Sequence, residues 1–400
     1  MKFLFEDESF SFEALRTACF ATYGGADLGE VLVTARAIGD GDEAAWHREW
    51  KNTAGRVHEL GNRSLAAGHR VSAREALLRA SNYYRTAEFY LRDNPFDDPD
   101  AKELSALARD TFATAAGLMD TPVEAVAIPY ADTTLPGCLF LVDDSGRPRP
   151  TVVFTSGFDS ILEEAYFAVA AAALRRGYNC LAYDGPGQGA ALREQRLFFR
   201  PDWESVLTPV LDHALTRQEI DPTRIALHGY SFGGLLVARA AAHEHRAAAL
   251  ILDDGIYSYF EATTRLIPPF LLQWMLEGRD EEAERVLSLM LPRNTALRWA
   301  LRNGVWTFGA DSPSDYVRRS RPYTLDGLAH QITTPALIFD PDNDATFKGE
   351  PQRLHQALTS PSTLITFPEA EGAGEHCSYG GRATLHQHLF DWLDDTLAIA

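Results

Sequence analysis

The sequence predicts an α/β fold in which a mostly parallel central sheet is flanked by helices. Three observations support this fold class: helix-type spacing of apolar residues before residue 120, alternating strand-like and helix-like runs after Val123, and a long helical interruption of that alternation. We expect a helical N-terminal cap at 1–120 and an α/β core at 121–400. A helical lid insertion is expected at about 257–325 within the core.

The predicted cap contains two well-marked helices. Apolar residues recur at helical spacing in the first, and Ser72 with Glu75 forms a capping-box pattern before them. The apolar positions are Leu77, Ala80, Tyr84, Ala87 and Leu91. A loop at 94–100 separates this helix from a second at about 101–118.

The predicted core begins with two strands and continues as strands that alternate with helices. Such alternation is typical of a parallel sheet, because a helix returns the chain to the start of the next strand. The expected strands lie at 123–129, 135–142, 151–155, 178–183, 224–228, 249–252 and 335–339. The glycine-rich turn at 184–189 lacks the spacing of a phosphate loop and is interpreted as a strand-to-helix turn lining the site.

A G-x-S-x-G motif at 229–233 lies between a strand-like run and an alanine-rich helix. Glycines in this context let the chain turn sharply and hold the serine hydroxyl above the sheet edge. Ser231 is therefore the predicted nucleophile.

An acid and a histidine follow Ser231 in the order that this motif requires. The strand at 335–339 ends in a turn that carries Asp340, Asp342 and Asp344, and the glycine-rich loop at 371–377 contains His376. His376 is the predicted general base. A triad acid should lie beyond the strand end, which favours Asp344, with Asp342 as second choice and Asp253 or Asp254 as fallback.

The backbone around the serine should also stabilise an oxyanion. The N–H groups of Phe232 and Phe158 are the predicted donors, and a slip of one residue would replace Phe158 by Gly157.

The chain resembles the α/β-hydrolases that carry a helical N-terminal cap. This group includes 2,6-dihydroxypseudooxynicotine hydrolase and fungal polyketide chain-shortening hydrolases. The resemblance rests on residues 68–76 and 80–85 in the cap and on 157–160, 163–164, 184–189, 229–234 and 372–377 in the core.

The resemblance implies a Ser–Asp–His hydrolase that cleaves a carbon–carbon bond beside a ketone, or an ester. It also implies an assisting carboxylate after the sixth strand, for which Glu261 is the candidate proton donor. Tyr230, inside the motif, is a candidate substrate-binding residue.

Composition limits the partners and the cofactors. The net charge of −19 disfavours binding to nucleic acid or to an anionic membrane surface, since both require clustered positive charge. No run approaches the roughly 20 apolar residues of a membrane span, the N-terminus lacks a signal-peptide pattern, and the four cysteines lack metal spacing. We expect a cytoplasmic protein with no metal and no cofactor, either as a monomer or as a homodimer.

The expected chemistry is acyl transfer through Ser231 on a small or medium apolar or aromatic carbonyl substrate. A covered pocket should contain aromatic residues of the lid, namely Phe260, Trp274, Trp299, Trp306 and Phe308. Two alternatives remain: an acyltransferase or cyclase that uses the same acyl-enzyme, and a non-catalytic binding protein that has kept the fold.

Overall fold

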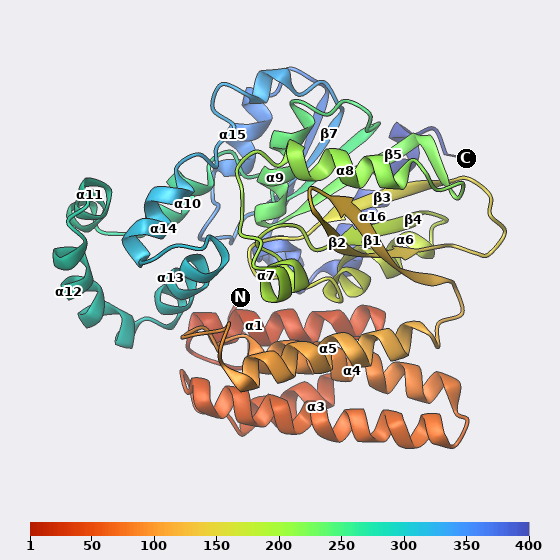
Figure 1. Cartoon of the computed structure of the whole chain (residues 1–400), viewed down its shortest axis with the longest axis horizontal. Helices are drawn as coiled ribbons and strands as arrows, with labels where there is room; N and C mark the ends of the chain where they lie inside the picture. Colours follow the sequence, from red (N-terminus) through yellow and green to blue (C-terminus); the bar gives the residue numbers. More distant parts are fainter. Residues whose placement is uncertain (400) are drawn as a thin grey trace.

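The computed structural model describes residues 1–399. Its N-terminal helices lie together as a layer beneath the sheet, coloured red to orange in Figure 1. They are α1 Glu8–Cys19, η1 Phe20–Tyr23, α2 Leu28–Arg36, α3 Glu43–Ala66, α4 Arg70–Glu88 and α5 Pro99–Ala116. Aspartate side chains accept backbone N–H groups at the starts of α1, α2, α3 and α5, which satisfies donors that have no partner inside the helix.

The start of α4 differs from the prediction. The helix begins at Arg70 with His69 in the capping position, so Ser72 and Glu75 lie inside the first turns and form no capping box. Helical backbone continues to Ala67 on the other side of the turn at Gly68, where φ is +78°. The left-handed conformation at Gly68 therefore fixes the junction, and the pattern at Ser72 does not.

The N-terminal helices have an apolar core of their own. Trp46 and Trp50 of α3 are fully buried, and Trp50 packs against Tyr83 of α4 with ring centroids 5.4 Å apart. These helices therefore form a packed layer, and side chains on the surface that faces the sheet are held in fixed positions.

The central sheet has eight strands in the order β1-β2-β4-β3-β5-β6-β7-β8. The β1–β2 and β2–β4 pairs are antiparallel, and all later pairs are parallel. The strands are β1 Val123–Tyr130, β2 Thr133–Phe140, β3 Arg149–Thr155, β4 Asn179–Tyr183, β5 Ile220–Tyr230, β6 Ala249–Asp253, β7 Ala336–Pro341 and β8 Ser362–Phe367. The predicted mostly parallel sheet is confirmed.

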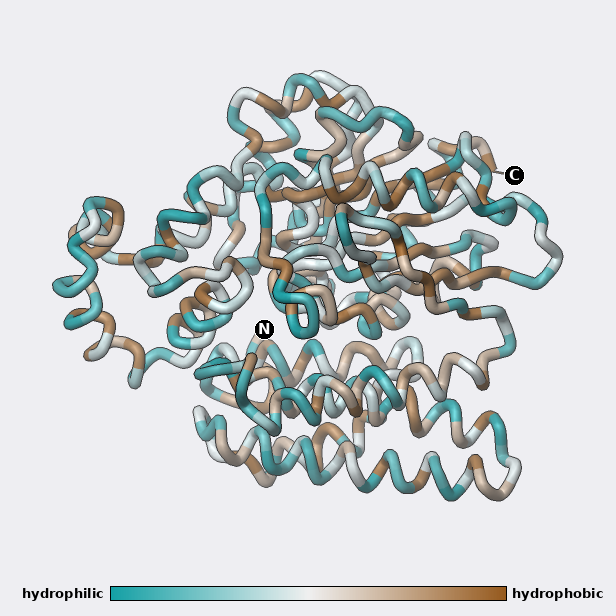
Figure 2. Tube along the Cα trace, in the orientation of Figure 1, coloured by the Kyte–Doolittle hydropathy of each residue, from teal (hydrophilic) through white to brown (hydrophobic). Residues whose placement is uncertain are grey.

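Both faces of the sheet are buried. Successive residues of β3 point to opposite faces, so Val153 belongs to the apolar cluster under α8 and α9, while Val152 belongs to the cluster under α6 and α16. Figure 2 shows the central strands as the most hydrophobic part of the trace. A sheet covered on both sides offers its carboxyl-end edge as the place for a site.

The core contains further helical segments, of which α8 and α9 cover one face of the sheet and α6 and α16 the other. They are η2 Tyr166–Ala170, α6 Ala171–Leu174, α7 Gly189–Gln195, α8 Glu204–Ala214, α9 Phe232–Ala241, η4 Ala329–Gln331, α15 Glu350–Ala357, η5 Glu369–Glu371, η6 His376–Ser378 and α16 Arg382–Thr396.

A group of helices interrupts the core between β6 and β7. Figure 1 shows them to one side of the sheet, with α11 and α12 farthest out. They are α10 Tyr259–Thr264, α11 Pro269–Glu277, α12 Asp280–Met290, η3 Leu291–Arg293, α13 Thr295–Thr307 and α14 Pro313–Ser320. Among the described residues, no helix is long and apolar enough to cross a membrane.

Candidate active site

Ser231 lies in the turn between β5 and α9. Its φ is +56° and its ψ is −127°, a strained backbone conformation for a residue with a side chain. Its backbone N–H donates to the carbonyl of Asp253 on the neighbouring strand, which holds the turn to the sheet. The serine hydroxyl is thus presented at the carboxyl end of the parallel strands.

The two flanking glycines are required by close backbone approach. A Cβ on Gly229 would lie 2.3 Å from the carbonyl oxygen of Gly233, and one on Gly233 would lie 2.4 Å from the carbonyl oxygen of Thr155. Neither space can accept a methyl group, because the opposing atoms are backbone. The G-x-S-x-G pattern is therefore the steric signature of this turn.

His376 faces the serine from the loop after β8. Its Nε2 lies 2.8 Å from Ser231 Oγ, a hydrogen-bond distance. Burial lowers the pKa of the imidazole, whereas the negative charges of Asp344 and Asp254 raise it, in sum well above the ordinary value. Burial also raises the pKa of the Cys377 thiol, so that this side chain is neutral near pH 7.

Asp344 contacts the other nitrogen of His376. Its Oδ2 lies 2.6 Å from His376 Nδ1, and its Oδ1 accepts the backbone N–H groups of Thr346 and Phe347. Burial would raise the pKa of Asp344, but His376 and the Phe347 N–H bring it below its ordinary value. Asp342, in contrast, accepts the N–H of Glu369 and is exposed.

A second carboxylate contacts the same nitrogen. Asp254 Oδ2 is also 2.6 Å from His376 Nδ1, and Asp254 is fully buried just beyond the end of β6. Sequence reasoning named this residue only as a fallback, since nothing local to it indicates that two strand ends converge on one histidine.

The predicted oxyanion donors lie on either side of the serine. Within residues 1–399, the backbone N–H groups of Phe232 and Phe158 make no hydrogen bond. Gly157 lies against the serine: a Cβ there would be 3.2 Å from Ser231 Oγ. The side chain of Gln188 donates to the carbonyl of Ser156 at 2.6 Å and so supports this loop from the turn at 184–189.

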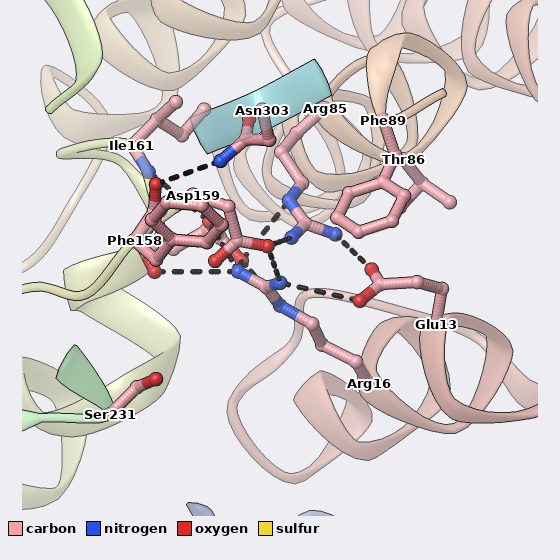
Figure 3. A network of polar contacts seen from close by, with 12 residues as sticks. Glu13, Arg16, Arg85, Thr86, Phe89, Phe158, Asp159, Ile161, Ser231 and Asn303 are labelled. Carbon is pink, nitrogen blue, oxygen red and sulfur yellow. Dashed lines mark hydrogen bonds and ion pairs between the residues drawn. The ribbon is translucent and has the colours of Figure 1, made fainter. Parts of the chain in front are cut away.

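A buried ion cluster holds the loop after Phe158 to the N-terminal helices (Figure 3). Arg16 of α1 donates to Asp159 at 2.7 Å and to Glu164 at 2.8 Å. Arg85 of α4 donates to Glu13 at 2.9 Å and lies 3.3 Å from Glu164. Four of these side chains are at most 5% exposed, and that of Asp159 is 14% exposed, so each charge depends on its partners for solvation.

The insertion also contacts the loop. Asn303 of α13 donates to the carbonyl of Phe158 at 3.1 Å, and its own carbonyl oxygen accepts from Arg92 at 2.9 Å. Figure 3 shows Asn303 reaching Phe158 from the side opposite Arg16. The sequence analysis gave no role to Arg16 or Asn303, which lie outside any motif, or to Arg85, which ends the resembling segment 80–85.

Two other expected site residues, Glu261 and Tyr230, do not face the serine hydroxyl. The carboxylate of Glu261 is 55% exposed and pairs with Arg353, so it faces solvent and not Ser231. Tyr230 is 3% exposed, and its ring packs against Phe154 and Tyr379 at 5.7 and 6.2 Å. Alternation along β5 turns Tyr230 into the core, which favours packing over substrate contact.

Aromatic side chains surround Phe158. Of the five expected lid residues, Trp299 and Phe308 contact it with ring centroids at 5.9 and 6.4 Å. Trp306 instead lies under the guanidinium groups of Arg92 and Arg193, and Trp274 packs against Phe270. The surroundings of Phe158 are therefore largely aromatic, and Trp299 and Phe308 bring the insertion into contact with this residue.

Two family models match the chain. Residues 152–384 match the alpha/beta hydrolase family, and residues 34–263 match the esterase FrsA-like family. The first match covers more than half of the chain and includes Ser231 and His376.

Curated relatives match over nearly the whole length. The chain is 36% identical to hydrolase LUC6 of Fusarium sp, with 99% of this chain and 98% of the relative covered. It is also 36% identical to 20-hydroxy-prefusarin hydrolase FUS2 of Gibberella moniliformis, with the same coverage.

The solved structure of 2,6-dihydroxy-pseudo-oxynicotine hydrolase has the same fold. It superposes with a TM-score of 0.75 at 20% identity and covers 95% of both chains. Together with the sheet topology and the sequence matches, this likeness identifies the chain as a hydrolase that belongs to the alpha/beta hydrolase family.

Proposed function

We propose that the protein is a serine hydrolase with Ser231 as nucleophile, His376 as general base and Asp344 as triad acid. The observation that carries this proposal is the continuous hydrogen-bonded series from Ser231 Oγ through both His376 nitrogens to Asp344, with distances of 2.8 and 2.6 Å. Such a series lets the hydroxyl lose its proton as it attacks a carbonyl carbon.

The reaction follows from these contacts. Ser231 Oγ attacks the carbonyl carbon while its proton passes to His376 Nε2, and the N–H groups of Phe232 and Phe158 stabilise the oxyanion. His376 then returns the proton to the leaving group, which departs to leave an acyl-enzyme. Water, activated by the same histidine, releases the acid.

We infer a small or medium apolar carbonyl compound as substrate, cleaved either at an ester or at a carbon–carbon bond beside a ketone. The aromatic surroundings of Phe158 support an apolar substrate. The 20-hydroxy-prefusarin hydrolase activity in the name of one relative supports a polyketide-like molecule.

We also infer that residues 1–120 act as a cap and residues 257–325 as a lid. Arg16 of the first segment and Asn303 of the second both contact the loop that carries Phe158. In addition, Trp299 Nε1 donates to the carbonyl of Phe89 at 2.9 Å, which joins the two segments directly.

Turnover of a matched substrate pair tests the proposed function. An aryl ester and a 1,3-diketone that carry the same acyl group are incubated with the enzyme, and the products are identified with and without a competing alcohol. Cleavage of the diketone to an acid and a ketone supports carbon–carbon hydrolysis. Cleavage of the ester alone indicates an esterase, an ester of the added alcohol indicates acyl transfer, and no turnover of either contradicts the proposal.

Glu261→Gln is expected to leave both activities within about twofold of wild type, because exposed substitutions away from a site have small effects. The side chain is 55% exposed and pairs with Arg353. Rates on both substrates check this expectation. A selective loss of diketone cleavage would place Glu261 in contact with the substrate.

Asn303→Asp is expected to lower kcat about tenfold with little change in KM, less than the 10²-fold or greater loss caused by removing an oxyanion donor itself. The variant keeps an acceptor for Arg92 but cannot donate to the carbonyl of Phe158. Steady-state kinetics on the ester separate the two constants. A rise in KM at constant kcat would assign Asn303 to substrate binding instead.

A further inference from the structure

Two carboxylates compete for one nitrogen in the proposed triad. Asp344 Oδ2 and Asp254 Oδ2 both lie 2.6 Å from His376 Nδ1. The two aspartates come from different strand ends, Asp344 from the loop after β7 and Asp254 from the end of β6. A neutral imidazole has a single N–H on this side, so it cannot donate a full hydrogen bond to each of them.

If Asp344 and Asp254 are both ionised, His376 cannot act as a base. Two negative charges beside Nδ1 stabilise the imidazolium, and anionic Asp344 and Asp254 both raise the pKa of His376. A histidine that is held protonated cannot accept the Ser231 proton. A working base in this geometry therefore requires one of the two negative charges to be removed.

The surroundings of Asp254 indicate where that charge is removed. Asp254 is fully buried, its Oδ2 accepts only the N–H of Cys377 besides the histidine contact, and its Oδ1 has no partner among the described residues. Asp344, in contrast, accepts two backbone N–H groups, which stabilise its anion. A proton therefore resides more favourably on Asp254 than on Asp344.

Asp253 is the other buried carboxylate nearby: burial raises its pKa to about 6, and neither of its oxygens has a hydrogen-bond partner among residues 1–399. Arg382 Nη1 of α16 lies 3.6 Å from Asp253 Oδ2, and His228 Nε2 of β5 lies 4.0 Å from the same carboxylate. Burial lowers the pKa of His228 to about 3, so it is neutral, and the Cys377 thiol is neutral as well. Arg382 is therefore the cation beside Asp253, and within residues 1–399 Asp254 has no ion-pair partner other than His376.

The titration of Asp254 agrees with this assignment. Burial raises its pKa to about 7, against the lowering effect of His376, and the charges of Asp344 and Asp253 raise it further. A hydrogen bond with Asp254 also contributes to the lowered pKa of Asp344. Two carboxylates that contact the same nitrogen interact strongly and titrate as a pair that takes up one proton first.

We propose that Asp254 and Asp344 share one proton and act together as the acid of the triad, with Asp254 as a positioning residue that can replace Asp344. This inference rests on the proposed Ser231–His376 function. Before attack, the proton lies between the two carboxylates and His376 donates Nδ1–H to the pair. During attack, the Ser231 proton moves to Nε2, and the single negative charge of the pair stabilises the imidazolium. The shared proton neither enters nor leaves the reaction.

The rate at which a fluorophosphonate labels Ser231 tests the proposal without the natural substrate. It is measured from pH 5 to 9 in the full-length protein for wild type, Asp254→Asn, Asp344→Asn and the double variant. The amide of Asp254→Asn imitates a protonated carboxyl but cannot ionise. Asp342→Asn is the matched control, because Asp342 lies in the same loop as Asp344 without contacting His376.

We expect Asp344→Asn to lower the labelling rate about 10- to 100-fold. The loss is smaller than the roughly 10⁴-fold loss that follows removal of a lone triad acid, because Asp254 still accepts the hydrogen bond from His376 Nδ1. The double variant should show the full loss in labelling rate, about 10⁴-fold. Asp254→Asn should lower the labelling rate less than tenfold and leave the acid limb of the profile in place, because the amide imitates a carboxyl that is already protonated in this pH range. Asp342→Asn should follow the wild-type profile.

Two results would overturn the proposal: an Asp344→Asn loss as large as that of the double variant, or an acid limb of Asp254→Asn that moves down by about one pH unit, which would mean that an ionised carboxylate had been removed. Failure of wild type to be labelled, or labelling that persists in Ser231→Ala, would instead contradict the proposed function itself. The two failures are thus distinct.

A measurement on wild type avoids any effect of the substitutions on folding. The ¹⁵N resonances of His376, identified by their absence in His376→Gln, report its protonation. A neutral imidazole with Nδ1–H at pH 7.5 supports the shared proton. An imidazolium at that pH means that both carboxylates are ionised and contradicts it.

Discussion

Ser231→Ala is expected to reduce hydrolysis by about 10⁶-fold, the scale seen when the nucleophile of a triad is removed. The variant loses the atom that attacks the carbonyl carbon and the hydrogen bond to His376 Nε2. The loss should appear in kcat. Hydrolysis of the aryl ester and mass spectrometry of the trapped acyl-enzyme provide the measurement, with a mass increase on wild type only.

Folding provides the control for this variant. Alanine retains the Cβ that fits the strained turn, and the N–H that donates to the carbonyl of Asp253 remains. We therefore expect a thermal unfolding midpoint close to that of wild type. Residual turnover within tenfold of wild type would exclude Ser231 as the nucleophile, whatever the geometry of its neighbours.

Arg16→Met is expected to destabilise the protein by about 3 to 5 kcal/mol, because removing one partner of a buried ion cluster leaves uncompensated charge. Arg16 pairs with both Asp159 and Glu164, and only Arg85 would remain beside the carboxylates of Glu13, Asp159 and Glu164. The free energy of unfolding in urea measures this effect.

The same variant should also lower kcat. Asp159 follows the predicted oxyanion donor Phe158, so loss of its anchor loosens the loop at 156–160. Arg63→Met is the matched control, since Arg63 is 66% exposed and pairs with an exposed glutamate. Its stability should change by less than about 0.5 kcal/mol. If both variants had the same free energy of unfolding, the buried ion cluster would make no net contribution to stability.

The local elements of the fold could be predicted from the sequence. Glycine is required at 229 and 233 because other backbone atoms approach closely there, so the turn at Ser231 can be predicted from these residues. The spacing of apolar residues likewise indicates which faces of the helices and strands are buried. Helix ends were less predictable. The start of α4 depends on the turn at Gly68, which competes with an equally regular capping pattern at Ser72.

Position in sequence was a poor guide to the auxiliary residues. Glu261 follows the sixth strand as the resemblance implied, yet α10 turns its side chain outward to Arg353. Asn303 lies 145 residues from Phe158, and Arg16 lies 143 residues from Asp159. Such pairs depend on how whole layers of helices dock, and that information is spread over many apolar contacts.

The sequence by itself determined the fold class, the position of Ser231 in its turn and the order in which acid and histidine candidates follow it. Each of these depends on backbone sterics or on periodicity within a short segment. Only the tertiary structure decided which carboxylates meet His376 and which buried arginines hold the loop at Phe158. These contacts join the ends of separate strands to two helical segments, so their geometry exists only once the layers have packed together.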